Sequence, residues 1–384
     1  MNPWTPAHED FRQTVRRFVE REITPHVNDW DEHAEEGGYF PRELYRKAAD
    51  IGLLAVGYPE ALGGIEADHL YRVIVTEEVA RAGSGGLLAS LLSHGIGLPP
   101  IVAQGAPELQ QRIVPGVLAG HKIAALAITE PGGGSDVARL RTTARLDGDH
   151  YVIEGEKVFI TSGLRADWLT VAVRTGGPGP AGLSLIAVPG DTPGLTRTPL
   201  RKMGWWASDT AHLRFDACRV PVENLIGEEG TGFAAIMRNF NAERLTLAVG
   251  ACAFAQVCID DALDWARQRQ TFGQPLAQHP VIRHKLVDMQ TAVASCKPWI
   301  ERLALKLDEG PADAQTVAEL CMLKNHATRA MQLCADQAVQ ILGGMGYMRG
   351  TRVERIYREV KVMMIGGGAE EIMKDLAARQ LGFR

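Results

Sequence analysis

The first third of the chain has the hydrophobic spacing of amphipathic helices. Apolar residues from Phe11 to Ile23 recur every three or four positions, and Pro25 follows where such a helix would end. Two further stretches, Glu43–Leu54 and Leu70–Ala82, have the same spacing, and glycine-rich segments separate them. The pattern therefore predicts a helical N-terminal domain.

The spacing changes to that of short strands after about residue 122. Residues 141–153 predict a hairpin that turns at Asp147-Gly148-Asp149. Three more β-rich runs are bounded by glycine and proline, as expected of a small barrel or sandwich. These runs are Trp168–Val173, Leu183–Val188 and His212–Phe215.

Helical spacing returns at Phe233 and continues almost to the end of the chain. Periodic Leu, Met, Val and Ala predict four long helices with short connections, which favours an antiparallel bundle. The four segments are 233–270, 280–308, 312–342 and 353–378. The predicted fold is thus α+β and mostly α, with a helical domain (1–121), a middle β-barrel (122–232) and a four-helix bundle (233–384).

Composition changes this picture mainly by exclusion. The 384 residues carry 41 Lys and Arg against 46 Asp and Glu, so a net charge of −5 argues against a nucleic-acid partner. The most apolar stretch, Leu87–Ala103, is interrupted by two prolines and is not expected to cross a membrane. Residues 1–4 show no basic apolar leader, and the six cysteines have no CxxC spacing. We expect a cytoplasmic protein with free thiols and no metal site.

Two segments have the composition of a ligand site. The loop Ala127–Asp136 places three consecutive glycines beside Thr, Ser and Asp, and such a loop exposes backbone N–H groups to an anionic or heteroaromatic ligand. In the following run Lys157–Gly163, alternation puts Phe159 and Thr161 on one strand face, where they suit a flat ring with a polar edge. A surface turn and an ordinary core strand remain the alternatives.

Five motifs, in order and at compatible spacing, resemble the acyl-CoA dehydrogenase family, and the resemblance runs from about residue 5 to the C-terminus. They are Ile128–Asp136; Phe159–Thr161; Lys202–Thr210 with Phe215–Pro221 and Asn224–Glu228; Arg267–Gly273; and Gln340–Tyr347 with Arg355–Arg358. The resemblance implies the same three-domain fold, non-covalently bound FAD and a homotetramer built as a dimer of dimers. It also implies oxidation of an acyl-CoA thioester of fatty-acid or branched-chain type to trans-2-enoyl-CoA, with a hydride passed to flavin N5 and electrons to an electron-transferring flavoprotein.

The resemblance also assigns residues. It implies that Phe159 covers the flavin ring, that Thr161 bonds its N5 edge, and that Ser135 meets the pyrophosphate or CoA. Arg269 is expected to bind phosphate oxygens of the FAD of a neighbouring subunit, a role that suits a guanidinium. The other implied FAD contacts are Leu126, Ile128, Thr129, Gly134, Thr271, Phe272, Gln340, Gly343, Gly344, Ala369 and Glu371. Ala369 and Glu371 stand where the family usually has Thr and Gln.

The catalytic base is the main departure from the family pattern. Most members carry a glutamate near the C-terminus, where this chain has Gly367. A minority branch, including isovaleryl- and long-chain-type enzymes, carries the base on the first bundle helix, and Glu243 matches that position. A carboxylate suits α-proton removal when burial raises its pKa. Glu370 and Glu371 are the rival carboxylates, and a solvated or arginine-paired Glu243 is the structural alternative.

Gly367 retains the backbone N–H that, in the family, bonds the thioester carbonyl. The glycine run opens space for branched or bulky acyl groups, with Gly366 and Arg244 as further substrate contacts. Trp205 and Trp206 are expected either to wall a pocket or to fill a barrel edge. The alternative functions are a flavin oxidase or monooxygenase and, more remotely, a non-catalytic flavin-bearing binding protein.

Overall fold

The computed structural model describes residues 3–33 and 39–383. Met1 and Asn2, which belong to the segment expected to carry no leader, lie outside the described residues. The N-terminal domain is helical, as predicted. Helix α1 begins at a capping box, in which Thr5 accepts from His8 N–H and the His8 ring accepts from Thr5 N–H. The elements are α1 (Pro6–Phe18), η1 (Val19–Ile23), α2 (Val27–Glu32), α3 (Glu43–Asp50), η3 (Glu60–Leu62), α4 (His69–Ala80), α5 (Gly85–Leu91), α6 (His94–Gly97), α7 (Pro99–Gln104) and α8 (Pro107–Leu118).

Helices α5 to α8 were not predicted from the sequence. In α5 nearly every residue is buried, and α6 and α7 have only four and six residues, so none of the three shows a clear helical period. Helix α8 does have an exposed polar face, which the sequence analysis missed. Pro99 and Pro107 each stand at the first turn of a new helix, where proline is tolerated, and they divide the segment into short pieces.

The middle domain is one continuous eight-stranded sheet. Its order is β6-β7-β3-β2-β4-β5-β8, and β1 pairs in parallel with β4. The predicted hairpin is confirmed, because β2 and β3 pair from Thr143–Glu154 to Asp147–His150. The strands are β1 (Ala124–Ala127), β2 (Thr143–Asp147), β3 (His150–Ile160), β4 (Trp168–Arg174), β5 (Leu183–Pro189), β6 (Leu195–Pro199), β7 (Ala211–Pro221) and β8 (Leu225–Ile226), with short 3-10 helices η4 (Val137–Arg139), η5 (Pro180–Gly182) and η6 (Val222–Asn224).

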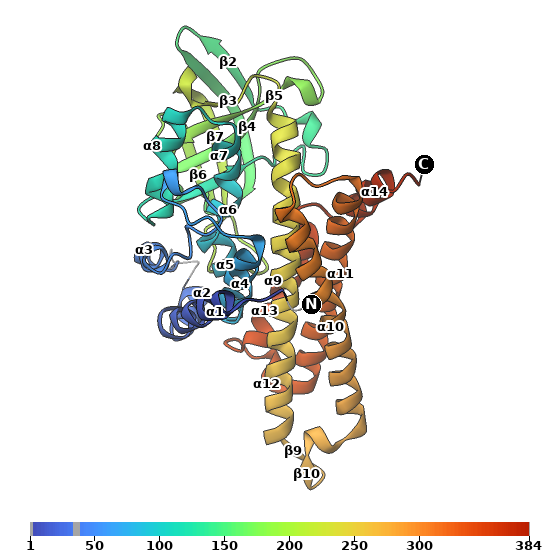
Figure 1. The fold of residues 1–384 in the computed structure, drawn as a ribbon. Helices are drawn as coiled ribbons and strands as arrows, with labels where there is room; N and C mark the ends of the chain where they lie inside the picture. The colour runs from blue at the N-terminus through green and yellow to red at the C-terminus, as the bar shows by residue number, and fades with distance from the viewer. Residues whose placement is uncertain (1–2, 34–38, 384) are drawn as a thin grey trace.

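The C-terminal domain is a helical bundle that extends away from the sheet (Figure 1). Its fourth predicted helix is broken into two, because Gly367 and Gly368 have φ of +66° and +110° and cannot continue a helix. The elements are α9 (Gly232–Gln268), the hairpin β9 (Gln270–Thr271) and β10 (Gln274–Pro275), η7 (Leu276–Gln278), α10 (Pro280–Asp308), α11 (Ala314–Leu342), α12 (Gly344–Tyr347), α13 (Arg352–Ile365) and α14 (Glu370–Gln380).

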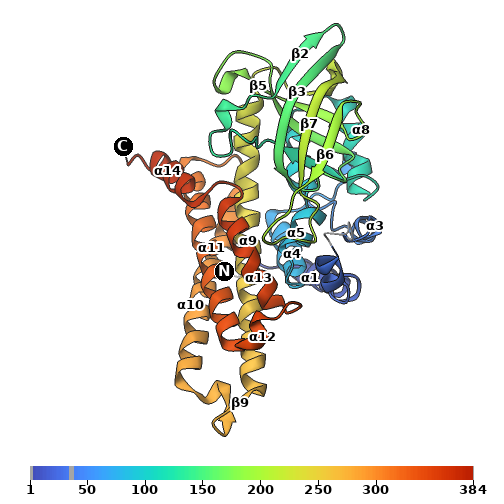
Figure 2. The same cartoon turned by 180° about the vertical axis from the view of Figure 1, so that it is seen from behind.

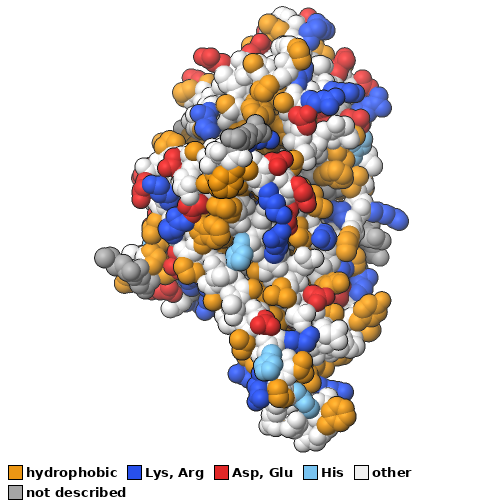
Figure 3. Space-filling model, turned by 90° about the vertical axis from the view of Figure 1, so that its right-hand side faces the viewer, with side chains coloured by type: hydrophobic (Ala, Val, Ile, Leu, Met, Phe, Trp, Pro, Cys, Tyr) orange, Lys and Arg blue, Asp and Glu red, His pale blue; other side chains and the backbone are white. Residues whose placement is uncertain are grey.

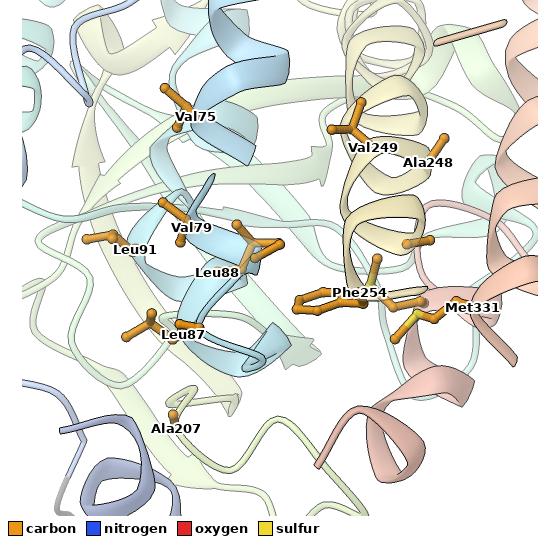
Figure 4. Packing of buried hydrophobic residues seen from close by; sticks show 14 of the residues in the cluster. Val75, Val79, Leu87, Leu88, Leu91, Ala207, Ala248, Val249, Phe254 and Met331 are labelled. Atoms are coloured by element: carbon orange, nitrogen blue, oxygen red, sulfur yellow. The ribbon is translucent and has the colours of Figure 1, made fainter. Parts of the chain in front are cut away.

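Helix α9 joins the three domains. It begins at the sheet, passes α4 and ends near the β9–β10 hairpin at the far end of the bundle (Figures 1 and 2). Buried side chains of α4, α5, α9 and α11 form one continuous core around it (Figure 4). Within the described residues, α9 alone is long and apolar enough to span a membrane as one straight helix, and the bent pair α5 with α6–α7 would be a second. The most apolar stretch of α9 is 67% buried in the protein, so core packing accounts for its composition.

Candidate active site

The two positions that the sequence connected with the base lie side by side in the structure. Glu243 is on α9, and Gly367 is in the turn between α13 and α14. A β-carbon placed on Gly367 would lie 3.8 Å from Oε1 of Glu243. The Glu243 carboxylate therefore faces the glycine turn, at the place where a side chain at residue 367 would begin.

The surroundings of Glu243 favour a carboxyl group that exchanges protons near neutral pH. Its Oε2 atom is buried and has no hydrogen-bond partner within the described chain. Burial raises the pKa of Glu243 to about 7, although the positive charges of Arg244 and Lys324 oppose the shift. A desolvated carboxyl group with an unused lone pair is suited to accept a proton from a bound molecule.

The two rival carboxylates have different environments. Glu370 bonds the Arg329 guanidinium and lies 2.7 Å from Lys374 Nζ, and these contacts lower its pKa to about 2. Glu371 is exposed on the first turn of α14. An ion-paired carboxylate of low pKa is a poor general base, so the geometry favours Glu243 over Glu370.

Arg244 follows Glu243 on α9, but its guanidinium contacts other residues. The buried guanidinium donates to Asn241 Oδ1 over 3.1 Å and lies 5.8 Å above the Phe240 ring. Its Nε is buried and has no partner among the described residues. Arg244 thus has an unused donor for a ligand, in keeping with the predicted substrate contact.

Leu247, one turn after Glu243, fills the space beside Gly367, and the sequence analysis missed it. A β-carbon on Gly367 would lie only 2.4 Å from Leu247 Cδ1.

We expect Gly367→Ala to lower the free energy of unfolding by about 1–3 kcal/mol, because it combines a left-handed backbone with this overlap. Gly148→Ala is the matched control, since Gly148 has φ +63° and nothing within 4 Å of the added carbon. Equal losses in thermal unfolding would show that Leu247 leaves enough room.

A buried ion pair between Lys157 and Glu130 stabilises the glycine loop. Lys157 Nζ lies 2.8 Å from Glu130 Oε1 and donates to the Ile128 carbonyl over 3.0 Å. The Glu130 carboxylate also accepts from the N–H groups of Arg141 and Thr142. Burial lowers the pKa of Lys157 to about 8, against the opposing effect of Glu130, so the lysine is still charged at neutral pH.

The predicted ring-covering residue stands on a strained backbone. Phe159 has φ +63° and is 68% exposed, which is unusual for an aromatic residue. A bulge between Lys157 and Ile160 interrupts the strand alternation, so Lys157 is buried while Phe159 points outward. Strict alternation, from which Phe159 and Thr161 were placed on one face, therefore does not extend across this part of β3. Thr161 follows β3 and is half-buried.

Strand and loop together fit a flat cofactor. Val158 N–H donates to Thr129 O over 2.8 Å, so the strand that carries Phe159 lies directly beside the glycine loop. A β-carbon on Gly132 would meet nothing within 4 Å, and one on Gly134 would meet only the Thr129 methyl group. The open loop and the exposed ring suit an isoalloxazine with an attached phosphate chain. Leu126 lies in β1 just before the loop, Ile128 is buried at the start of the loop, and Gly134 and Ser135 are exposed on it.

The remaining predicted FAD residues form two separate groups. Ala369 and Glu371 flank the α14 N-terminus, close to Gly367 in the chain. The others lie on or near the β9–β10 hairpin and α12, at the end of the bundle away from the sheet (Figures 1 and 2). Phe272 at the hairpin tip is 99% exposed and has φ +49°. This group consists of Arg269, Thr271, Phe272, Gln340, Gly343 and Gly344.

The two tryptophans fill a domain junction. Trp205 packs on the α5 N-terminus at Gly85, and its backbone N–H donates to Glu359 Oε1 of α13. The guanidinium carbon of Arg358 lies over the Trp206 ring, 3.7 Å from the ring centroid. These contacts favour the packing alternative for both residues.

Comparison with known proteins covers nearly the whole chain. Three family models match: the acyl-CoA dehydrogenase N-terminal domain at residues 5–121, the middle domain at 125–218 and the C-terminal domain at 230–382. Mitochondrial isovaleryl-CoA dehydrogenase of Oryza sativa subsp. japonica is 34% identical over 98% of this chain and 91% of its own. A putative acyl-CoA dehydrogenase structure from Mycobacterium smegmatis is 48% identical, with a TM-score of 0.96 over 99% of each chain. An acyl-CoA dehydrogenase structure from Bacillus anthracis complexed with FAD is 30% identical, with a TM-score of 0.92 over 99% of this chain and 69% of that one.

Proposed function

This chain belongs to the acyl-CoA dehydrogenase family and is an FAD-dependent oxidoreductase that dehydrogenates acyl-CoA, and we propose that Glu243 is its general base. The observation that carries the proposal is the placement of Glu243 Oε1 3.8 Å from the missing Gly367 β-carbon. The family's usual base position is thus vacant, and a carboxylate from another helix occupies its surroundings. FAD, when bound, supplies the acceptor for the hydride that leaves the β-carbon.

The proton chemistry follows from the Glu243 environment. The ionised carboxylate removes the α-proton of the thioester, and the buried site holds its pKa near 7, so that a large share is ionised at neutral pH. The Gly367 N–H donates to the thioester carbonyl and stabilises the negative charge that develops on this oxygen. Glycine at residue 367 allows the carbonyl to approach the backbone closely.

The acyl group is proposed to be branched or bulky. Residues 366–368 have no side chains to compete with the acyl group, although Leu247 and Met373 already fill the positions next to Gly367 and Gly368 and limit the room there. The relative from rice is named for isovaleryl-CoA, a branched thioester. Pocket shape decides such specificity, so the acyl group is open to direct test.

The test is an anaerobic titration of the FAD-loaded protein with straight and branched acyl-CoAs. If one subset of the acyl-CoAs bleaches the flavin, the result supports dehydrogenase activity and identifies the substrate class. No bleaching by any thioester would contradict the proposal and favour the oxidase or monooxygenase alternative. Slow reoxidation by oxygen while product is bound separates a dehydrogenase from an oxidase.

The assembly proposed is a homotetramer in which two subunits share each FAD, with electrons passed to an electron-transferring flavoprotein in the cytoplasm. The β9–β10 hairpin, which carries the exposed Phe272, lies at the end of the bundle away from the sheet, and this supports a role toward another subunit (Figure 2). Apolar side chains are also exposed on the outer faces of α10 and α11, and the space-filling view shows apolar groups among charges of both signs (Figure 3). These α10 and α11 side chains are Val281, Val287, Leu305 and Leu333.

Arg269→Ala is expected to weaken FAD binding by about tenfold to a hundredfold, the range for one charge-assisted hydrogen bond. Arg267→Ala is the matched control, because Arg267 is an exposed arginine two residues earlier that pairs with Asp264 over 3.7 Å. The FAD dissociation constant of each variant is measured by flavin fluorescence. A monomer with full FAD affinity, or equal effects of both substitutions, would contradict the shared site.

A further inference from the structure

A buried lysine holds the turn that carries Gly367. Lys324 lies on α11, and its side chain is completely buried. Its Nζ donates to the Met364 carbonyl and to the Gly368 carbonyl, each over 2.8 Å. Met364 is in the last turn of α13, where carbonyls lack helical partners, and Gly368 stands just after Gly367. One ammonium group therefore ties together the two sides of the turn.

The next residue on α11 also bonds the backbone after the turn. Asn325 Nδ2 donates to the Glu370 carbonyl, in the first turn of α14, over 3.0 Å. Gly367 and Gly368 both have left-handed φ, so the turn is built from residues with wide conformational freedom. Because the glycines do little to restrict their own backbone, the bonds from α11 restrict it on both sides of Gly367.

The lysine also contributes charge to the site. Lys324 and Arg244 are the positive groups whose charges act on Glu243, and both favour its ionised form. Glu370 of α14 and Cys321 of α11 are the other titratable groups whose charges act on Lys324. Burial lowers the pKa of Lys324 to about 8, so the lysine is still mostly protonated at neutral pH.

We propose that Lys324 is a positioning residue for the dehydrogenation: it fixes the turn that presents the Gly367 N–H to the thioester carbonyl and keeps a positive charge beside the base. This inference rests on the proposed roles of Glu243 and Gly367. A lysine that served only to cap α13 would stabilise the fold without affecting how the enzyme recognises a carbonyl or titrates its base. Those two properties therefore distinguish the proposal from a structural role.

The first measurement concerns carbonyl recognition. In the Glu243→Gln background, where no proton is removed, an acyl-CoA thioester and the matching thioether without the carbonyl are bound to the FAD-loaded protein. We expect K324M to reduce the preference for the thioester by about tenfold or more, because misplacing one oxyanion donor costs that much or more. Lys285→Met is the control, since Lys285 bonds Gln337 between α10 and α11. It is expected to keep the full preference.

The second measurement concerns the base. With Glu243 present, the pH midpoint of flavin reduction is expected to rise in K324M and in K324Q, because both remove the positive charge that favours the carboxylate. K324R, which keeps charge and donors, is expected to restore the midpoint. An unchanged thioester preference together with an unchanged midpoint in folded, FAD-loaded K324M would overturn the inference.

These experiments distinguish a failure of the Lys324 role from a failure of the proposed function. If the wild type reduces its flavin and Glu243→Gln does not, the proposed function stands whatever Lys324 does. If no acyl-CoA reduces the wild-type flavin, the proposed function itself fails. Should K324M not fold, K324Q carries the test, because its amide keeps donors and removes only the charge, and an unchanged midpoint in K324Q then overturns the charge role.

Discussion

Glu243→Gln is expected to slow flavin reduction by about a hundredfold to ten-thousandfold, the usual contribution of a general base. Glutamine has nearly the same shape and removes no packing, so binding of FAD and of acyl-CoA should be retained. The amide cannot accept the α-proton, and the substrate should therefore remain bound and unreacted. Anaerobic stopped-flow mixing, with flavin bleaching followed at several pH values, measures the effect.

The pH profile of the wild type adds a signature of its own. Since the base acts in its ionised form and its pKa is about 7, reduction should accelerate as pH rises toward 7 and level off above it. The control is Glu370→Gln, which removes a carboxylate of low pKa that is paired with Arg329 and Lys374. It should leave the rate within a few-fold. If flavin reduction stays fast in Glu243→Gln and becomes slow in Glu370→Gln, the base is Glu370 on α14 and not Glu243.

Lys157→Met is expected to destabilise the protein by about 3–5 kcal/mol, the cost of removing one partner from a buried ion pair. Methionine fills a similar volume but leaves the Glu130 carboxylate buried without its cation. The Ile128 carbonyl also loses its donor, so the glycine loop should lose its fixed shape and FAD affinity should fall with it. Thermal unfolding and FAD content of the purified protein measure the two effects.

A double variant tests the cause. Glu130→Gln in the Lys157→Met background removes the stranded charge and keeps an oxygen to accept from the Arg141 and Thr142 N–H groups. It should recover a substantial part of the lost stability. Lys122→Met is the exposed control, since Lys122 lies 3.6 Å from Asp167 at the surface, and it should change little. A stable Lys157→Met protein that binds FAD normally would mean that the loop does not depend on this pair.

The long helices and the hairpin could be predicted because their signals are local. Periodic apolar residues mark α9, α10 and α11, and Asp147-Gly148-Asp149 marks the β2–β3 turn. The signal fails where burial is nearly complete, as in α5, since a helix surrounded by protein needs no polar face. It also fails at a bulge: the β3 alternation does not show that Lys157 is buried beside an exposed Phe159.

The sequence contains only a weak signal that Lys324 is buried. It stands among residues that are apolar or small at helical spacing, such as Leu320, Cys321, Ala327 and Thr328, all of them buried. A lysine on the core face of a helix has to find polar partners. The sequence does not say which partners, because the carbonyls of Met364 and Gly368 reach it from another part of the chain.

By itself the sequence determined the family, the three-domain order and the glycine loop, since each depends on residue types at short, ordered spacing. It also offered Glu243 as a base, but as one carboxylate among three. Only the tertiary structure decided that α9 brings Glu243 against Gly367 while Glu370 turns to Arg329. The physical reason is that a base is defined by distance and desolvation, and packing of separate helices creates both.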